Sequence, residues 1–272
     1  MALRSPLINV MADAAKKAAR GLLRDFGEVE QLQVSLKGPA DFVSNADRRA
    51  EQTIMAELKK ARPRFGFLME EQGVVEGEDT SNRWVIDPLD GTTNFLHGIP
   101  HFGISIALER DGHPYAGVIY DSARDEMFFA EKGQGAYLNE RRIRVSGRQK
   151  LEDAVLTTGI PHRGRPGRDL FMPGVRAFME ITAGVRRFGS AALDLAWVAA
   201  GRCDGYWERS LKAWDMSAGI VIVREAGGIV TDIDGKDDML ATGHILASNP
   251  PLHAAMLETL KKAEKGFVEP AA

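Results

Sequence analysis

Two carboxylates lie close together in the run WVIDPLDGTTNF, residues 84–95. Residues 84–86 predict a strand that delivers Asp87, and Pro88 is expected to stop its hydrogen-bond ladder. Because the chain then bends into a Gly-Thr-Thr turn, Asp87 and Asp90 can face one point. Facing carboxylates raise each other's pKa unless a cation lies between them. Hard divalent ions such as Mg²⁺ bind oxygen ligands together with phosphate and water. The run therefore favours a metal-assisted phosphate site.

The same run also has a purely structural interpretation, because D-P-x-D-G is a common turn composition. Further acids lie where other elements should begin or end. Glu70 and Glu71 close the expected strand FGFLMEE, while Asp47 and Asp215 lie at the starts of expected helices. Such acids are often only helix caps or solvated pairs. Both interpretations stay open on the residues alone.

The four motifs GPADFVSNAD, FLMEEQG, WVIDPLDGTTNF and WDMSAG occur in an order and spacing that resembles the inositol monophosphatase family. The resemblance runs from about Leu7 to Leu260. It implies a layered αβαβα sandwich, α+β or α/β in class, of the inositol monophosphatase and fructose-1,6-bisphosphatase type. It also implies a lithium-sensitive homodimer that hydrolyses myo-inositol monophosphate through water activated by about two or three Mg²⁺ ions per site.

The resemblance assigns metal and water roles to individual residues. It implies that Asp87 bridges two metal ions. The full ligand set that it implies is Glu70, Asp87, the main-chain carbonyl of Leu89, Asp90 and Asp215. It further implies that Asp47 and Thr92 orient the attacking water, with Glu70 completing the catalytic group.

The resemblance also implies contacts to the substrate, a small phosphorylated polyol. Gly91 and Thr92 correspond to positions that touch the phosphate, beside Asp90. The implied contacts to the sugar-alcohol ring are Gly189, Ala191, Glu208 and Asp215. Lys37 lies in the segment expected to fold over the metals. Related phosphatases act on fructose bisphosphate, histidinol phosphate or phosphoadenosine phosphate, so the substrate stays open between an inositol and another phosphorylated compound.

The elements that must position these residues differ between the two halves of the chain. Ser5 and Pro6 predict the start of a first helix, and residues 44–61 predict a second, with a short hairpin between them. The runs RWVID, FGISIALE, AGVIYD and MFFAEKG predict an antiparallel sheet. We expect a first part, 1–148, with this sheet and most of the metal ligands, and a second part, 149–272, that completes the site.

The second part alternates strand and helix signals. VLTTG, VRRFG, CDGYWE, GIVTDI and HILASN predict strands, and the two runs DLFMPGVRAFME and AALDLAWVAAG predict helices. A further helix is expected to begin at Asp215, with that residue as its cap and Gly227 after its end. A last helix should run from Pro251 to about Lys265. Together the halves predict one continuous fold.

Composition narrows the class of protein. The chain has 35 Lys and Arg and 38 Asp and Glu, which gives a net charge of −3. This balance argues against a dedicated nucleic-acid binder, which usually has an excess of basic residues. The lone Cys203 excludes an intramolecular disulfide. No apolar run approaches the ~20 residues that cross a bilayer, and the N-terminus predicts an amphipathic helix. A cytoplasmic protein without a membrane partner is expected. The LDGT run is unlike an aspartyl-phosphate phosphatase, because Pro88 holds the position of that nucleophile.

One alternative is a binding role. The segment RRIRVSGRQK, residues 141–150, carries five basic side chains, and a second basic run includes Arg163, Arg165 and Arg168. These residues can form a docking surface for RNA or for an acidic partner, or simply a solvated sheet edge and loop. The acidic total favours the solvated edge.

Overall fold

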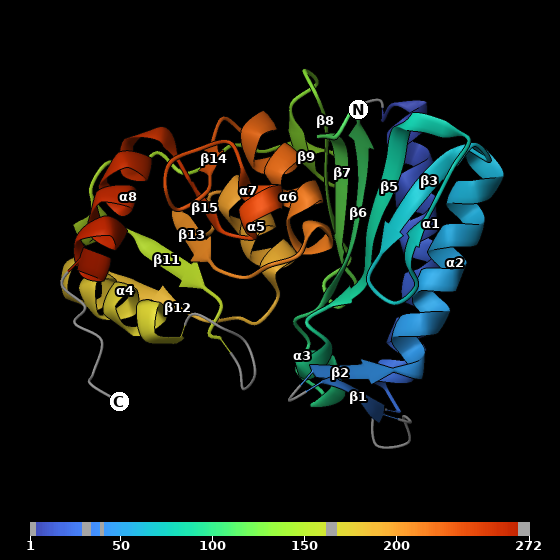
Figure 1. Ribbon diagram of the computed structural model, residues 1–272, viewed down its shortest axis with the longest axis horizontal. Helices are drawn as coiled ribbons and strands as arrows, with labels where there is room; N and C mark the ends of the chain where they lie inside the picture. The colour runs from blue at the N-terminus through green and yellow to red at the C-terminus, as the bar shows by residue number, and fades with distance from the viewer. Residues whose placement is uncertain (1–3, 29–33, 39–40, 162–167, 266–272) are drawn as a thin grey trace.

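Five layers of helices and sheets make up the computed structural model, which describes residues 4–28, 34–38, 41–161 and 168–265. Figure 1 shows a helix pair, a large sheet, a second helix pair, a smaller sheet and a third helix pair in succession. The predicted αβαβα sandwich is thus confirmed. In layer order the helices are α1 (Pro6–Phe26) and α2 (Asn45–Ala61), α5 (Ala191–Ala199) and α6 (Ala213–Glu225), and α4 (Arg168–Ile181) and α8 (Pro250–Lys265).

The large sheet has eight strands in the order β10-β9-β8-β7-β6-β5-β3-β4. The expected antiparallel pairing holds except that β3 runs parallel to β5, with Met69 opposite Ile86. Parallel pairing places the carboxyl ends of both strands at one edge. The strands are β3 (Phe65–Met69), β4 (Gly73–Val75), β5 (Asp79–Asp90), β6 (Gly103–Arg110), β7 (His113–Asp121), β8 (Glu126–Glu131), β9 (Ala136–Leu138) and β10 (Arg141–Arg142).

The smaller sheet has five strands in the order β12-β11-β13-β15-β14, with β11 parallel to both of its neighbours. Its strands are β11 (Val155–Thr158), β12 (Gly184–Arg186), β13 (Gly205–Glu208), β14 (Ile229–Thr231) and β15 (Ile245–Ser248). The predicted short hairpin is confirmed as β1 (Val34–Gly38) and β2 (Asp41–Ser44). Short helices α3 (Thr92–Leu96) and α7 (Met239–Thr242) and a 3₁₀ turn at Leu151–Asp153 complete the described elements.

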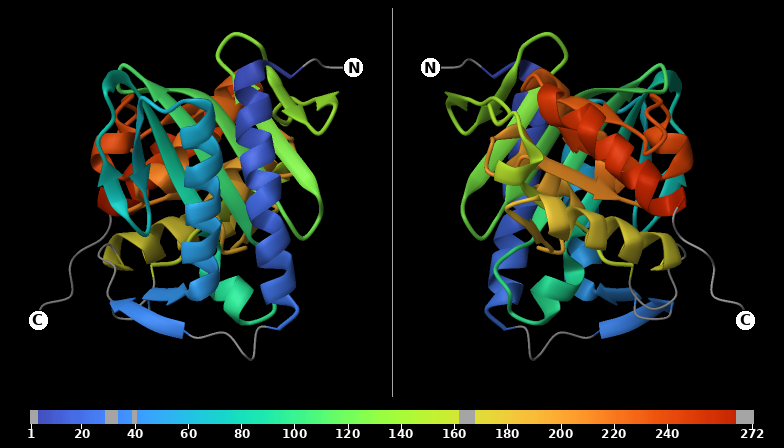
Figure 2. Two further views of the ribbon diagram at one scale, coloured as in Figure 1. Left: turned by 90° about the vertical axis from the view of Figure 1, so that its right-hand side faces the viewer. Right: turned by 90° about the vertical axis from the view of Figure 1, so that its left-hand side faces the viewer.

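Apolar packing explains the layers. Helices α1 and α2 lie side by side over the outer face of the large sheet (Figure 2) and share one apolar cluster with it. Helices α5 and α6 fill the space between the two sheets. Every residue of α6 from Met216 to Val223 is buried, which explains its continuous apolar run. Helix α6 approaches β7 so closely that a Cβ at Gly117 would lie 2.5 Å from the Ala218 carbonyl oxygen.

Several helix ends follow the predicted signals. Ser5 caps α1 by accepting a hydrogen bond from the Ile8 N–H at 3.1 Å, with Pro6 as the first helical residue. Helix α6 ends before Gly227, whose φ of 86° lies in the left-handed region. None of the described helices is both long and apolar enough to cross a membrane.

Two expectations at the candidate site were wrong. Strand β5 does not stop at Asp87 but continues to Asp90, because a register shift between these residues places Pro88 where no ladder hydrogen bond is needed. Helix α6 begins at Ala213 rather than at Asp215, so Asp215 lies in its first turn and is not the cap. The last helix begins one residue before the predicted Pro251, within the usual uncertainty of helix ends.

Candidate active site

The end of β5 is shaped by its own side chains. The Leu89 N–H donates to Asp87 Oδ1 at 3.0 Å, which fixes the irregular stretch between the two acids. Thr92 Oγ1 donates to the Leu89 carbonyl oxygen at 3.0 Å and ties the start of α3 to this stretch. Gly91 lies between them with φ of 91°, and a Cβ there would lie 3.0 Å from the His101 carbonyl oxygen. Only glycine fits this turn without strain.

Glu70 reaches the same edge because β3 and β5 are parallel. Its N–H donates to the Ile86 carbonyl oxygen at 3.2 Å, next to Asp87. The turn that follows is held by Glu51, a fully buried residue of α2. The Glu51 carboxylate accepts the N–H groups of Glu71 at 2.8 Å and Gln72 at 3.1 Å. Helix α2 therefore fixes the segment that presents Glu70.

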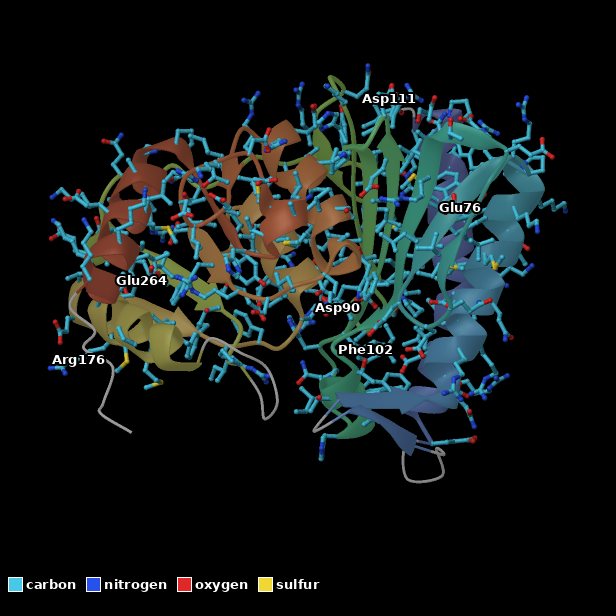
Figure 3. The ribbon with its side chains drawn as sticks, in the orientation of Figure 1. Glu76, Asp90, Phe102, Asp111, Arg176 and Glu264 are labelled. Atoms are coloured by element: carbon cyan, nitrogen blue, oxygen red, sulfur yellow. The ribbon has the colours of Figure 1, made fainter. Side chains whose placement is uncertain are left out.

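Asp90 is held from the other half of the chain. Its Oδ2 atom accepts the Ser190 hydroxyl at 2.6 Å and the Ala192 N–H at 2.7 Å. Ser190 is also the N-cap of α5, so the carboxylate lies at the positive end of that helix. Asp90 lies between the two sheets, at the lower centre of the view in Figure 3.

Asp215 comes from a third element, the first turn of α6. Its Oδ2 atom accepts the N–H of Lys212 at 2.7 Å. This contact fixes the carboxylate at the helix start, where negative charge is favourable.

The electrostatics of Asp87 show that these acids are neighbours. Burial raises its pKa well above the ordinary value, and the charges of Glu70, Asp90 and Asp215 raise it further. Burial also raises the pKa of Asp90 to about 6, although the bond from Ser190 opposes this shift. Four clustered acids favour a cation among them.

The donor set fits a hard divalent cation in its chemistry. It consists of four carboxylates and the Leu89 carbonyl, all of them oxygen ligands. In the described part of the chain, no three acidic, imidazole or thiol side chains converge on a single point as a ready-made ligand set. Asp90 and Asp215 are instead turned towards hydrogen-bond donors of the protein.

These residues line a pocket of about 290 Å³, near the lower end of the range for small-molecule sites. Ten of the residues predicted from the sequence line it together: Glu70, Asp87, Leu89, Asp90, Gly91, Thr92, Gly189, Ala191, Glu208 and Asp215. Asp47 is buried in the first turn of α2 and does not line the pocket. Lys37 lies on β1, but its side chain is outside the described part of the structure.

Sequence reasoning missed seven residues that line the pocket, among them Gly159, Arg187 and Asp194. Asp194 is 1% exposed, and burial together with Glu208 and Asp90 raises its pKa well above the ordinary value. A signal for it was available, because an acid inside the apolar run AALDLAWVAA is unusual for a structural helix. Gly159 and Arg187 gave no comparable signal.

The basic segment 141–150 lies away from this pocket. Arg141 and Arg142 form β10, the exposed edge strand of the large sheet. Further along, Arg148 pairs with Asp204. Arg141 and Arg142 are exposed at this edge, which fits both a solvated edge and a docking surface, while 163 and 165 in the second basic run lie outside the described residues.

Comparison with known proteins assigns the class. The family model described as "Inositol monophosphatase family" matches residues 3–265, so the chain belongs to the inositol monophosphatase family and is a phosphatase. It is similar to the inositol-1-monophosphatase of Mesorhizobium japonicum, with 60% identity covering 95% of this chain and 97% of that protein. It is also similar to the Nus factor SuhB of Pseudomonas aeruginosa, with 46% identity covering 94% of this chain and 96% of that protein.

The fold comparison agrees with the sequence comparison. The crystal structure of the extragenic suppressor protein suhB from Bartonella henselae has a TM-score of 0.93 and 57% identity to this chain. The match covers 95% of this chain and 99% of that one.

Proposed function

We propose that this protein hydrolyses myo-inositol monophosphate to inositol and phosphate with Mg²⁺ as its metal. The observation that carries the proposal is the convergence of four carboxylates and the Leu89 carbonyl, from β5, from the end of β3 and from α6, in one pocket. The names of the relatives at 54–60% identity support the substrate. A cytoplasmic homodimer with no membrane partner is part of the proposal.

The chain's own residues supply distinct functions in this reaction. Glu70, Asp87, Asp90, Asp215 and the Leu89 carbonyl would hold the divalent ions. When bound, the ions supply a nucleophilic water at neutral pH and neutralise charge on the attacking and leaving oxygens. The site provides only oxygen ligands for them.

The remaining predicted residues orient the water and the phosphate. Thr92 and Asp47 are proposed to position the attacking water, with Thr92 fixed by its 3.0 Å bond to Leu89. Gly91 and Thr92 are proposed to contact the phosphate, where the turn leaves the backbone accessible in the pocket.

The part of the pocket lined by β13 and the start of α5 is proposed to bind the sugar-alcohol ring. Glu208, Gly189 and Ala191 line the pocket there. A carboxylate accepts hydrogen bonds from hydroxyl groups and does so more strongly than a neutral acceptor. Glu208 therefore favours a polyhydroxyl substrate over a plain phosphate ester.

A panel of phosphate esters tests the proposal directly. We expect turnover of myo-inositol 1-phosphate with Mg²⁺, no turnover after exhaustive chelation, recovery on adding Mg²⁺, and inhibition by Li⁺. The panel should include p-nitrophenyl, histidinol and fructose phosphates. Full turnover after chelation would contradict the metal-dependent chemistry, and a strong preference for histidinol or fructose phosphate would contradict the substrate.

A second candidate function is binding of RNA or of an acidic partner through segment 141–150. The observations that favour it are the exposed basic edge strand β10 and the relatives named Nus factor SuhB. An Asp87→Asn variant separates binding from catalysis. Salt-dependent retention on RNA by this variant would support the binding role, because phosphate contacts release counterions. Absence of retention at low salt would contradict RNA binding.

A further inference from the structure

The Glu208 carboxylate is held on one side by a buried tyrosine. Tyr206 and Glu208 are two residues apart on β13, so their side chains leave the same face of the sheet. The Tyr206 hydroxyl donates to Glu208 Oε2 at 2.6 Å. Tyr206 is 0% exposed, so its ring is fixed by packing. The donor therefore has little freedom to follow the carboxylate if that group moves.

The other side of the carboxylate is closed by a glycine. Gly159 follows β11, which pairs with β13 so that Thr158 lies opposite Trp207. A Cβ built on Gly159 would lie 2.0 Å from Glu208 Oε2 and 2.1 Å from Oε1. The carboxylate thus occupies the space that any side chain at position 159 would take. Any other residue there would force Glu208 to turn away.

The charges around the carboxylate show why it needs a donor. Asp194 is buried beside it, and the charge of Glu208 contributes to the raised pKa of Asp194. Burial, Glu208 and Asp194 raise the pKa of Tyr206 far above the ordinary value, so the hydroxyl keeps its proton and remains a donor. Without that donor, the hydrogen bond that orients the Glu208 carboxylate on this side is lost.

We propose that Tyr206 and Gly159 are specificity-determining residues that hold the Glu208 carboxylate in the position where it accepts the ring hydroxyls of the polyol substrate. The inference rests on the proposed function, since it needs Glu208 to contact the substrate. Neither residue has a role at the metal ligands. Tyr206 acts by a hydrogen bond, and Gly159 acts by leaving space.

The test measures a selectivity ratio, kcat/KM for a polyol phosphate divided by kcat/KM for p-nitrophenyl phosphate. The polyol phosphate is the one that the wild type turns over best in the ester panel. We expect Tyr206→Phe to lower the ratio by about 5- to 30-fold, less than the loss of the Glu208 carboxylate itself, because the carboxylate is still present but less well oriented. Gly159→Ala should lower it by at least about 10-fold, because the added methyl group displaces the carboxylate.

Two matched controls separate this role from a loss of stability. Tyr120→Phe removes the hydroxyl of another buried tyrosine, which lies on β7. That hydroxyl donates to Asp125 at 2.6 Å. Gly147→Ala adds a methyl group where no atom lies within 4 Å. We expect neither control to change the selectivity ratio. A general structural effect would lower the ratio in Tyr120→Phe as well.

A double-mutant cycle tests whether Tyr206 acts through Glu208. In a Glu208→Ala background, Tyr206→Phe and Gly159→Ala should produce no further loss of the ratio. Losses that multiply instead would overturn the inference. So would an unchanged ratio in both single variants while Glu208→Ala lowers it, and that result would leave the proposed function standing. If Glu208→Ala does not lower the ratio for any polyol phosphate, the polyol assignment and this inference both fail.

Discussion

The proposed metal end of the pocket consists of Glu70, Asp87, Asp90 and Asp215, whose charges raise the pKa of Asp87. The proposed polyol end consists of Gly159, Gly189, Ala191 and Glu208, where the Tyr206 hydroxyl donates to the Glu208 carboxylate. The first group of residues concentrates negative charge, whereas the second combines close packing with a hydrogen bond from a neutral donor. Catalysis and selectivity should therefore be separable by mutation.

The largest effect is expected at the metal end. Asp87→Asn should lower kcat by at least about 10³-fold, because charge stabilisation near the reacting phosphate is lost. The metal-free variant should be as stable as the wild type or more stable at pH 7. Burial and three acids raise the pKa of Asp87 in the folded state, so its ionisation opposes folding above the unfolded-state pKa. Steady-state kinetics and thermal unfolding in chelator measure both effects. Near wild-type turnover with Mg²⁺ would contradict a bridging role.

Substituting one acid from each end, Glu208 or Asp215, tests whether selectivity and catalysis are separable. Glu208→Ala should cost on the order of 1.5–3 kcal/mol of binding to ring hydroxyls, or about 10- to 150-fold in kcat/KM for inositol phosphate. Turnover of p-nitrophenyl phosphate should fall much less. Asp215→Ala should damage both substrates, because it removes a proposed metal ligand. Equal losses on the two esters for Glu208→Ala would show that the two ends are not separable.

A smaller effect is expected at Glu51, which supports the turn after Glu70 but is not itself a proposed metal ligand. Glu51→Gln should raise the Mg²⁺ concentration needed for half-maximal activity by about 10-fold, since residues that support ligands typically change metal affinity by this order. The amide cannot accept both the Glu71 and Gln72 N–H groups as the carboxylate does.

The matched control is Glu57→Gln on the same helix. Glu57 makes a surface ion pair with Lys17 at 2.5 Å, which contributes little to stability. An Mg²⁺ dependence that is the same in both variants would argue against the positioning role of Glu51.

The smallest effect on catalysis is expected at His101, where a substitution should change the pH dependence of stability but not the selectivity. His101 lies between the rings of Phe188 and Trp197, with Arg124 nearby, and burial lowers its pKa from 6.5 to about 4. Between these values the unfolded chain takes up a proton that the folded chain does not. Stability should therefore be complete above pH 6.5 and fall as the pH decreases towards 4. His101→Phe should remove at most about 3 kcal/mol of this loss, measured by urea unfolding. An unchanged acid profile would contradict the assignment.

Local signals were enough to predict much of this fold. Ser5 and Pro6 marked a helix start through hydrogen bonding within a few residues. The arrangement in five layers was predicted from the family resemblance that the four motifs carry. The start of α6 was predicted two residues too late. Acidic residues are favourable both at the cap and at the third position of a helix, and Asp215 occupies the third position. Local composition did not distinguish between these positions.

Long-range pairing was the part that the sequence did not reveal. The parallel alignment of β3 with β5 depends on packing between strands, yet it places Glu70 beside Asp87. The continuation of β5 past Pro88 depends on a register shift with β6. Asp194 was missed because an apolar helix hides a single buried acid. Glu208 was assigned by resemblance, while its contact with Tyr206 required the structure.

The hydrogen bond from Ser190 to Asp90 joins residues that are 100 positions apart. A ribosome adds about 5–20 residues per second, so the partner of Asp90 is made about 5–20 s after Asp90 itself. Asp215 follows later still. During that interval a nascent chain exposes acids at the end of β5 without the helix that orients them. An incomplete chain therefore lacks both Ser190 and Asp215, and the pocket is assembled only when the second half has folded onto the first.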